Sequence, residues 1–292
     1  MSRSGERAAA GEPKVVGFCL TGPSTPVGAL LRDLWASRRL VGVLARKDFL
    51  VRYRRTRLGL IWAVAVLLVQ AAVLAVVFSS VLPNVTTSGG SGRLGSYAVF
   101  VLSGMVPWAF VSGALPAAST SIADSANLAQ RIYFPRLVLP LVAVVTACYP
   151  LLATLGVFLA VALVLGPGLQ PELLWVLPGS LLVVLVVLSL SLFLSAAQVY
   201  LRDLRFVVSA GLTVLFYLTP VIYPLERAPE AAHNLIRVLP ASGAVEIFHR
   251  AVGAADPLMW RSVLASAVWI LVFGVAGLVL HSRRDRVLAD LL

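Results

Sequence analysis

Six long stretches of the sequence contain no Asp, Glu, Lys or Arg, and they constrain the fold more than any other feature. A helix needs about 20 apolar residues to cross a hydrocarbon core of about 30 Å, and each stretch is long enough. The stretches occupy 58–92, 94–123, 137–171, 173–201, 206–225 and 262–282. The membrane helices are expected near 60–82, 96–116, 139–165, 174–198, 206–223 and 262–281.

Composition and periodicity agree with a membrane protein built from helices. The chain is 59% hydrophobic and 13% charged, whereas about 25% of the residues of a soluble domain are charged. Stretches such as 181–194 (LLVVLVVLSLSLFL) are apolar on every face, and the period-two alternation of membrane strands is absent. The sequence therefore predicts an all-α integral membrane protein, with six transmembrane helices in a domain over residues 59–285.

The distribution of basic residues predicts how the chain is oriented. Nineteen of the 24 Lys and Arg residues lie in the two terminal segments and in the loops after the second and fourth expected helices, and five lie in the other loops. Basic residues accumulate on the cytoplasmic side of membrane proteins. Both termini are therefore expected in the cytoplasm.

The N-terminal region divides into two parts. Residues 1–26 are rich in Gly, Pro, Ser and Ala and predict a disordered cytoplasmic tail,. In 27–58, apolar residues alternate with Arg, Lys and Asp at helical spacing, which predicts an amphipathic interfacial helix,. Four arginines crowd the end of this segment and are expected to attract anionic lipid rather than nucleic acid: Arg52, Arg54, Arg55 and Arg57. Residues 286–292 form a second cytoplasmic tail.

Two other polar segments are expected to stay outside the hydrocarbon core. The segment 224–261 carries eight charged residues, too many for a spanning helix,. Two short amphipathic helices broken near Pro240 and Gly243 fit it best, as a re-entrant external hairpin between helices 5 and 6. The segment 121–131 is interpreted either as a short cytoplasmic helix or as a solvated loop.

The chain lacks the residues that several functions require. No GxxxxGK[ST] phosphate loop occurs, and GPSTPVG (22–28) lacks the lysine of such a loop,. The expected spans hold almost no ionisable side chains, which disfavours proton- or ion-coupled transport. The three histidines and two cysteines show no metal-ligand spacing,. We therefore expect no catalytic residues, no metal site and no cofactor in this chain.

Four stretches in the same order along the chain carry a family resemblance. They are ARKDFLVRYRRTRLGLIWAV (45–64), ANLAQRIYFPRLVLP (126–140), VYLRDLRF (199–206) and LTPVIYP (218–224). Together they resemble the permease subunits of ABC-2 type exporters that move lipid-linked polysaccharides such as O-antigen, teichoic acid or cell-wall galactan. The chain departs from the family at Leu239-Pro240, where many relatives have Asn-Pro, and in the length of its N-terminal tail.

The resemblance implies a bacterial cytoplasmic (inner) membrane protein that works with partners. Two copies would pair with two copies of a separate cytoplasmic ATPase, which would bind ATP and Mg and supply the missing phosphate loop. The cytoplasmic loop between the second and third helices would dock on this ATPase. The coupling residues implied by this match are Asn127, Leu128, Arg131, Tyr133, Phe134 and Arg136.

The implied substrate leads to further expectations. A glycan needs a path sheltered from hydrocarbon, because an unpaired hydroxyl costs roughly 2–7 kcal/mol there, and aromatic rings offer faces for sugar rings. Aromatic residues near the outer ends of spans are expected either to line this path or to form a belt facing lipid. They are Phe78, Tyr97, Phe100, Phe216, Tyr217 and Tyr223. The four clustered arginines are also candidates to meet the substrate's pyrophosphate at the cytoplasmic entrance.

Two alternatives stay open at this point. An ABC-2 exporter of drugs or small lipids would have the same six spans, but it would not need the stretches at 45–64 and 126–140. A membrane scaffold or assembly factor would explain the spans and the basic N-terminal region, and it would need no ATPase.

Overall fold

The computed structural model describes residues 27–54, 59–81, 94–125, 136–165, 168, 170–201, 203–254 and 256–284. Every regular element in these ranges is a helix, which confirms the all-α prediction. The elements are α1 (Val27–Ala36), α2 (Arg38–Arg54), α3 (Ile61–Val81), α5 (Leu94–Asp124), α7 (Val138–Leu165), η1 (Pro171–Trp175), α8 (Val176–Tyr200), α9 (Leu204–Leu218), η2 (Leu225–Arg227), α10 (Glu230–Val238), α11 (Ser242–Ala251) and α12 (Met259–Arg284). The two predicted tails, 1–26 and 286–292, lie outside the described residues.

Five helices are long and apolar enough to cross a membrane: α3, α5, α7, α8 together with η1, and α12. The remaining predicted span, 206–223, overlaps the shorter helix α9 of 15 residues, which is about 22 Å long and shorter than a 30 Å core. It ends because Thr219 precedes Pro220, and the residue before a proline disfavours helical geometry. Thr219 accordingly has extended backbone angles, φ −73° and ψ 138°.

The chain after α9 is buried although it is not helical. Thr219, Pro220, Val221 and Ile222 are all buried. A Cβ on Gly104 of α5 would lie 2.4 Å from the carbonyl oxygen of Val221, so only glycine allows this approach. Irregular backbone can be buried where protein encloses it, and α5 provides part of that enclosure here,.

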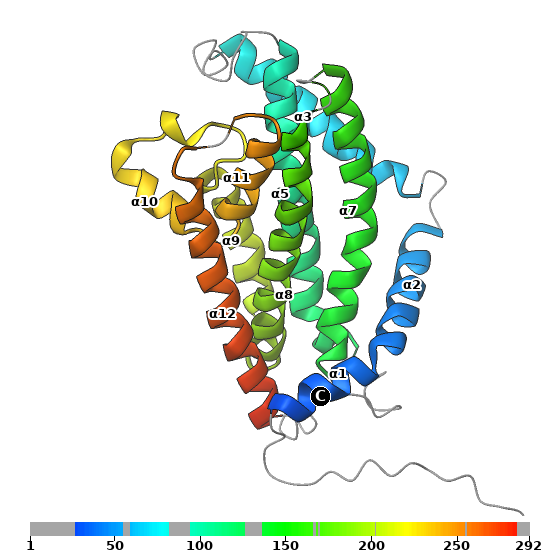
Figure 1. Ribbon diagram of the computed structural model, residues 1–292. Coiled ribbons are helices and arrows are strands. Elements are labelled where there is room, and N and C mark those ends of the chain that lie inside the picture. The colour runs from blue at the N-terminus through cyan, green and yellow to red at the C-terminus, as the bar shows by residue number, and fades with distance from the viewer. Residues whose placement is uncertain are drawn as a thin grey trace, which may run out of the picture.

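Helix α5 forms the centre of the bundle. Within its segment Tyr97–Asp124, 78% of the span is buried, against 11–33% for the other four spans. It contacts α3, α7, α8, α9 and α11, and Figure 1 shows it in the middle of the upright helices. The suggested cytoplasmic helix over 121–131 begins as the last turn of α5, and residues 126–131 lie outside the described ranges.

The predicted interfacial helix over 27–58 is two helices in the structure. Ser37 separates α1 from α2, and Arg38 closes the end of α1 by donating from Nη1 to the carbonyl of Trp35 at 2.9 Å. Figure 1 shows α1 at the end of the bundle, close to the last turns of α12, with α2 rising along α7. The chain therefore enters and leaves the bundle at the same end. Residues 55–58 lie outside the described ranges.

The segment after α9 folds into two short helices, α10 and α11, as the sequence indicates. The break falls at Leu239, which has extended geometry with ψ 145° just before Pro240. Gly243 does not break the pair, because it is the second residue of α11. Its missing Cβ lets α11 approach α12, where a Cβ would lie 2.6 Å from the carbonyl oxygen of Ser262. Residues 242–249 of α11 are all buried.

Candidate functional site

A groove of about 760 Å³ runs between α3, α5 and α9. Its walls comprise Ala63 to Leu74 on α3, Met105 to Gly113 on α5, and Leu212 to Tyr217 on α9. The three helices form it because α9 packs on α5 through only a narrow face, on which Val208 and Leu212 are buried. The outward faces of α3 and α9 remain exposed and bound the groove.

The groove contains polar side chains in an otherwise apolar region. Gln70 is exposed near the middle of the 21-residue helix α3, and no hydrogen bond to its amide exists within the described ranges. Ser112 donates to the carbonyl of Ala109 at 3.3 Å, and Thr213 donates to that of Ser209 at 3.2 Å. Unpaired polar groups are costly in hydrocarbon. Gln70 therefore places a hydrogen-bonding amide on the wall of this groove.

Aromatic rings line one side of the groove. Phe216 lies 5.5 Å from Trp108 and 5.3 Å from Tyr217, measured between ring centroids. Tyr217 is 64% exposed. Of the six aromatic residues singled out in the sequence, Phe216 and Tyr217 line this groove. Trp108 also lines the groove, and it was not predicted because it lies in the middle of α5, away from the ends of the apolar spans.

The other four predicted aromatic residues lie outside the groove lining. Tyr97 and Phe100 are buried in the core of the bundle, where Phe100 stacks on His249 with centroids 4.2 Å apart. Phe78 packs partly buried against the same core. The hydroxyl of Tyr223 donates to the carbonyl of Leu218 at 3.0 Å, just past α9. These rings are arranged as structural contacts of the helix bundle.

The described part of the chain includes only some of the predicted basic and coupling residues. Arg52 is exposed near the end of α2, and Arg136 is half-buried before α7, where its Nη1 bonds to no described residue. The side chain of Arg54 is outside the described part. Seven other predicted residues lie entirely outside the described ranges: Arg55, Arg57, Asn127, Leu128, Arg131, Tyr133 and Phe134.

A buried polar cluster ties the two short helices to the start of α12. Arg237 of α10 donates from Nη2 and Nε to Oδ2 of Asp256, at 2.7 and 3.0 Å. The backbone N–H of Asp256 donates to Oε2 of Glu246 at 3.1 Å. Burial raises the pKa of the Glu246 carboxyl to about 7, and burial lowers the pKa of His249 to about 3. The sequence showed the charges of this segment, but nothing in their spacing predicted the cluster.

Comparison with known proteins identifies the family. The profile described as ABC-2 type transporter matches residues 39–251, which is more than half of the chain. An O-antigen export system permease protein RfbA of Myxococcus xanthus is 28% identical over 272 residues, covering 88% of this chain and 96% of the relative. Two proteins of the same name from Klebsiella pneumoniae are 28% identical over 209 residues (70% and 77% covered) and 25% identical over 248 residues (82% and 87% covered). The chain is a member of the ABC-2 type transporter family.

Proposed function

We propose that this chain is the permease subunit of an ATP-driven exporter that moves a lipid-linked polysaccharide, of the O-antigen, teichoic acid or galactan type, outward across the bacterial cytoplasmic membrane. Its membership of the ABC-2 family and its similarity to O-antigen export permeases support this proposal. The observation that carries it is the groove between α3, α5 and α9, where Gln70 and Tyr217 are exposed on apolar membrane helices.

The chemistry of the groove suits an amphipathic substrate. Sugar hydroxyls can pair with the Gln70 amide, and the faces of sugar rings can stack on Tyr217 and Phe216. The polyprenol anchor gains about 0.8 kcal/mol per methylene by staying in lipid. Because the groove is open along its side, the glycan can occupy it while the anchor remains in the bilayer. A second copy of the chain facing the groove would close it into a channel.

The topology that we propose has six crossings with both termini in the cytoplasm. Because α1 contacts α12, the first and last described helices meet at one end of the bundle, which supports an even number of crossings. The five long helices alone would give an odd number. Helix α9 with the buried segment 219–222 would supply the sixth. Helices α10 and α11 then form the re-entrant hairpin at the outer side, where the Arg237–Asp256 ion pair is largely shielded.

The energy for transport would come from a separate ATPase. The loop between α5 and α7 is proposed to dock on it through the six residues from Asn127 to Arg136 named above. The clustered arginines at 52–57 would meet the pyrophosphate of the substrate where the chain turns from α2 into α3. Two permease copies and two ATPase copies would make the complete exporter.

The proposal is tested by purifying the chain together with its ATPase and reconstituting the complex in nanodiscs. Lipid-linked glycan is expected to stimulate ATP hydrolysis, whereas the same polyprenyl diphosphate without its glycan is expected to stimulate less. Stimulation by apolar drugs and not by glycan would favour the drug or small-lipid exporter. Failure of the two proteins to co-purify would favour the scaffold.

A further inference from the structure

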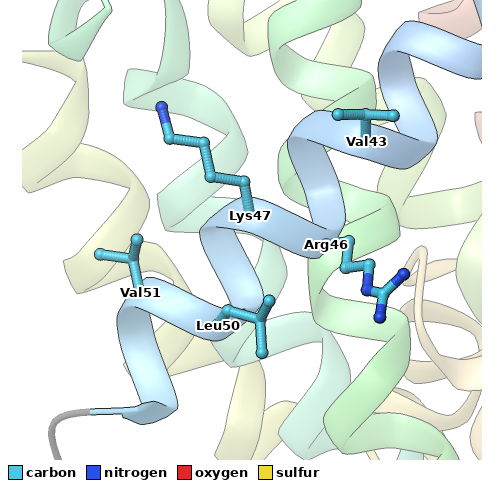
Figure 2. Close-up of a pocket in the computed structure, with 5 residues that line it drawn as sticks. All are labelled: Val43, Arg46, Lys47, Leu50 and Val51. Carbon is cyan, nitrogen blue, oxygen red and sulfur yellow. The ribbon is translucent and has the colours of Figure 1, made fainter.

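Helix α2 presents an apolar face that the bundle does not cover. Its opposite face packs on α7, where Val41 and Ala45 are buried against Val138 and Val142. The uncovered face bears a shallow groove of about 400 Å³ lined by Val43, Arg46, Lys47, Leu50 and Val51. Val43, Leu50 and Val51 are 67%, 45% and 62% exposed. Figure 2 shows Arg46 and Lys47 leaving the helix in different directions, with Leu50 and Val51 on the next turn.

The length of α7 places this groove at headgroup level. Its 28 residues are about 42 Å long, about 12 Å more than the hydrocarbon core. At its far end Leu163, Val164 and Leu165 are exposed, so that end belongs in hydrocarbon and the excess lies at the Val138 end. The excess corresponds to about eight residues, and these include Val138 and Val142, which pack against Val41 and Ala45 of α2.

The direction of α2 then sets the order of its groups relative to the bilayer. The contacts run from Ala45, whose carbonyl accepts a hydrogen bond from the Thr146 hydroxyl at 3.4 Å, to Phe49, whose ring centroid lies 4.6 Å from that of Tyr149. The two helices are therefore parallel, and both go deeper into the membrane as the residue number rises. Leu50 and Val51 consequently lie about one turn deeper than Arg46 and Lys47. The cations lie nearer the membrane surface and the apolar residues lie deeper, which is the order of the phosphate and the acyl chains in a phospholipid.

The charge on this face also suits an anionic ligand. Among the described residues the one ion pair is Arg237–Asp256, so no described acid pairs with Arg46 or Lys47. Asp48 is the single acid of α2 and is not part of the groove lining. A second copy of the chain docked symmetrically here would bring like charges together, because such an interface uses the same patch on both subunits.

We propose that this groove binds one anionic glycerophospholipid of the cytoplasmic leaflet. Lys47 holds its phosphate and an acyl chain lies along Val51, one turn deeper on the same face of α2. Arg46, which leaves the helix in another direction, adds positive charge beside the site. The inference rests on the orientation proposed above and not on the identity of the exported molecule. Its role is to anchor α2 upright against α7, ahead of the turn into α3.

The test is native mass spectrometry of the full-length chain, purified in detergent and titrated with dioleoylphosphatidylglycerol or dioleoylphosphatidylcholine. Wild-type protein is expected to retain one phosphatidylglycerol more tightly than phosphatidylcholine. Replacing both cations (Arg46→Gln with Lys47→Gln) is expected to weaken phosphatidylglycerol binding roughly thirtyfold, because each basic residue near an anionic surface contributes about fivefold. The matched control, Arg250→Gln with Arg261→Gln, removes two exposed arginines at the other end of the bundle and is expected to keep wild-type binding.

Three results would overturn the inference. They are equal retention of the two lipids, wild-type phosphatidylglycerol binding by the double variant, and displacement of the lipid by an excess of inorganic phosphate or of polyprenyl diphosphate. Loss of ATPase co-purification in the double variant, with lipid binding unchanged, would assign the face to the ATPase instead. Lipid retention without glycan-stimulated ATP hydrolysis would contradict only the proposed function. Glycan-stimulated ATP hydrolysis without lipid retention would contradict only this inference.

Discussion

The hydroxyl of Tyr97 donates a hydrogen bond to the backbone carbonyl of Ile222, with the two oxygen atoms 2.7 Å apart. Tyr97 lies in the first turn of α5, and Ile222 lies in the buried non-helical segment after α9. Such a segment cannot satisfy its own carbonyls as a helix does. This bond therefore fixes the end of the shortest candidate crossing to α5, the most buried of the five long helices.

Tyr97→Phe should destabilise the protein while keeping its shape. The substitution leaves the Ile222 carbonyl buried without this donor, and an unsatisfied buried group costs about 1–3 kcal/mol. Thermal unfolding in detergent should show a lower Tm. Tyr217→Phe serves as the control, since Tyr217 is largely exposed and should keep its Tm. Equal Tm values for the Tyr97 variant and wild type would show that this bond contributes nothing to stability.

Gly104→Ala should also destabilise the protein, although alanine is the better helix former. The added Cβ would overlap the backbone of Val221, and overpacking typically costs about 1–3 kcal/mol. The control is Gly156→Ala on α7, where a Cβ meets nothing within 4 Å. That change should raise Tm slightly through helix propensity. A stabilising Gly104→Ala would mean that the segment after α9 does not press on α5.

Stability should depend on pH through Glu246. Burial raises its folded-state pKa from 4.5 to about 7, so the folded protein holds this proton where the unfolded chain has released it. Its contribution is complete below pH 4.5 and is lost as pH rises towards 7. The neighbouring charges are Asp256, Arg237 and Glu226.

Glu246→Gln isolates this effect, because glutamine keeps an acceptor for the Asp256 N–H. The Tm of the variant minus the Tm of wild type should increase from pH 5 to pH 8. His249 has the opposite dependence, since its lowered pKa costs stability below its ordinary value of 6.5. It is present in both proteins and cancels in the difference. A Tm difference that stays constant with pH would contradict the account.

Reversing two charges in the loop before α7 should uncouple transport. Arg131→Glu with Arg136→Glu is expected to leave membrane insertion intact and to abolish export, because the loop would no longer dock on an ATPase surface that complements its positive charge. Export is measured as surface polysaccharide in cells, and insertion as protein in the membrane fraction. Normal export by the double variant would remove these residues from the coupling site.

The apolar stretches predicted most of the fold because a membrane helix requires about 20 uncharged residues in one run. Helix ends were harder to place. The prediction carried the fifth span to residue 223, whereas Thr219-Pro220 ends α9 at Leu218. The amphipathic pattern of 27–58 predicted one helix, and the described part is helical over 27–36 and 38–54. The pattern did not show the break at Ser37 or that α2 stands against α7. Which apolar face meets another helix depends on tertiary packing.

The site was less predictable for a related reason. Tyr97 and Tyr217 both occur near the ends of apolar spans, yet Tyr97 is 5% exposed and Tyr217 is 64% exposed. Helices that are apolar on every face carry no periodicity that separates inward from outward positions. Gln70 was the one available signal, as an amide in the middle of a charge-free run. The groove residues Trp108 and Thr213 join it only when three helices are brought together.

The central claim is that the groove between α3, α5 and α9 carries the glycan, and site-specific photocrosslinking in exporting cells tests it most directly. A benzoylphenylalanine in place of Thr213 lies in the groove, and one in place of Leu271 lies on the exposed face of α12. The account predicts a polysaccharide adduct at position 213 that disappears when ATP hydrolysis is blocked, and only lipid adducts at position 271. Polysaccharide adducts at 271 but not at 213 would contradict it.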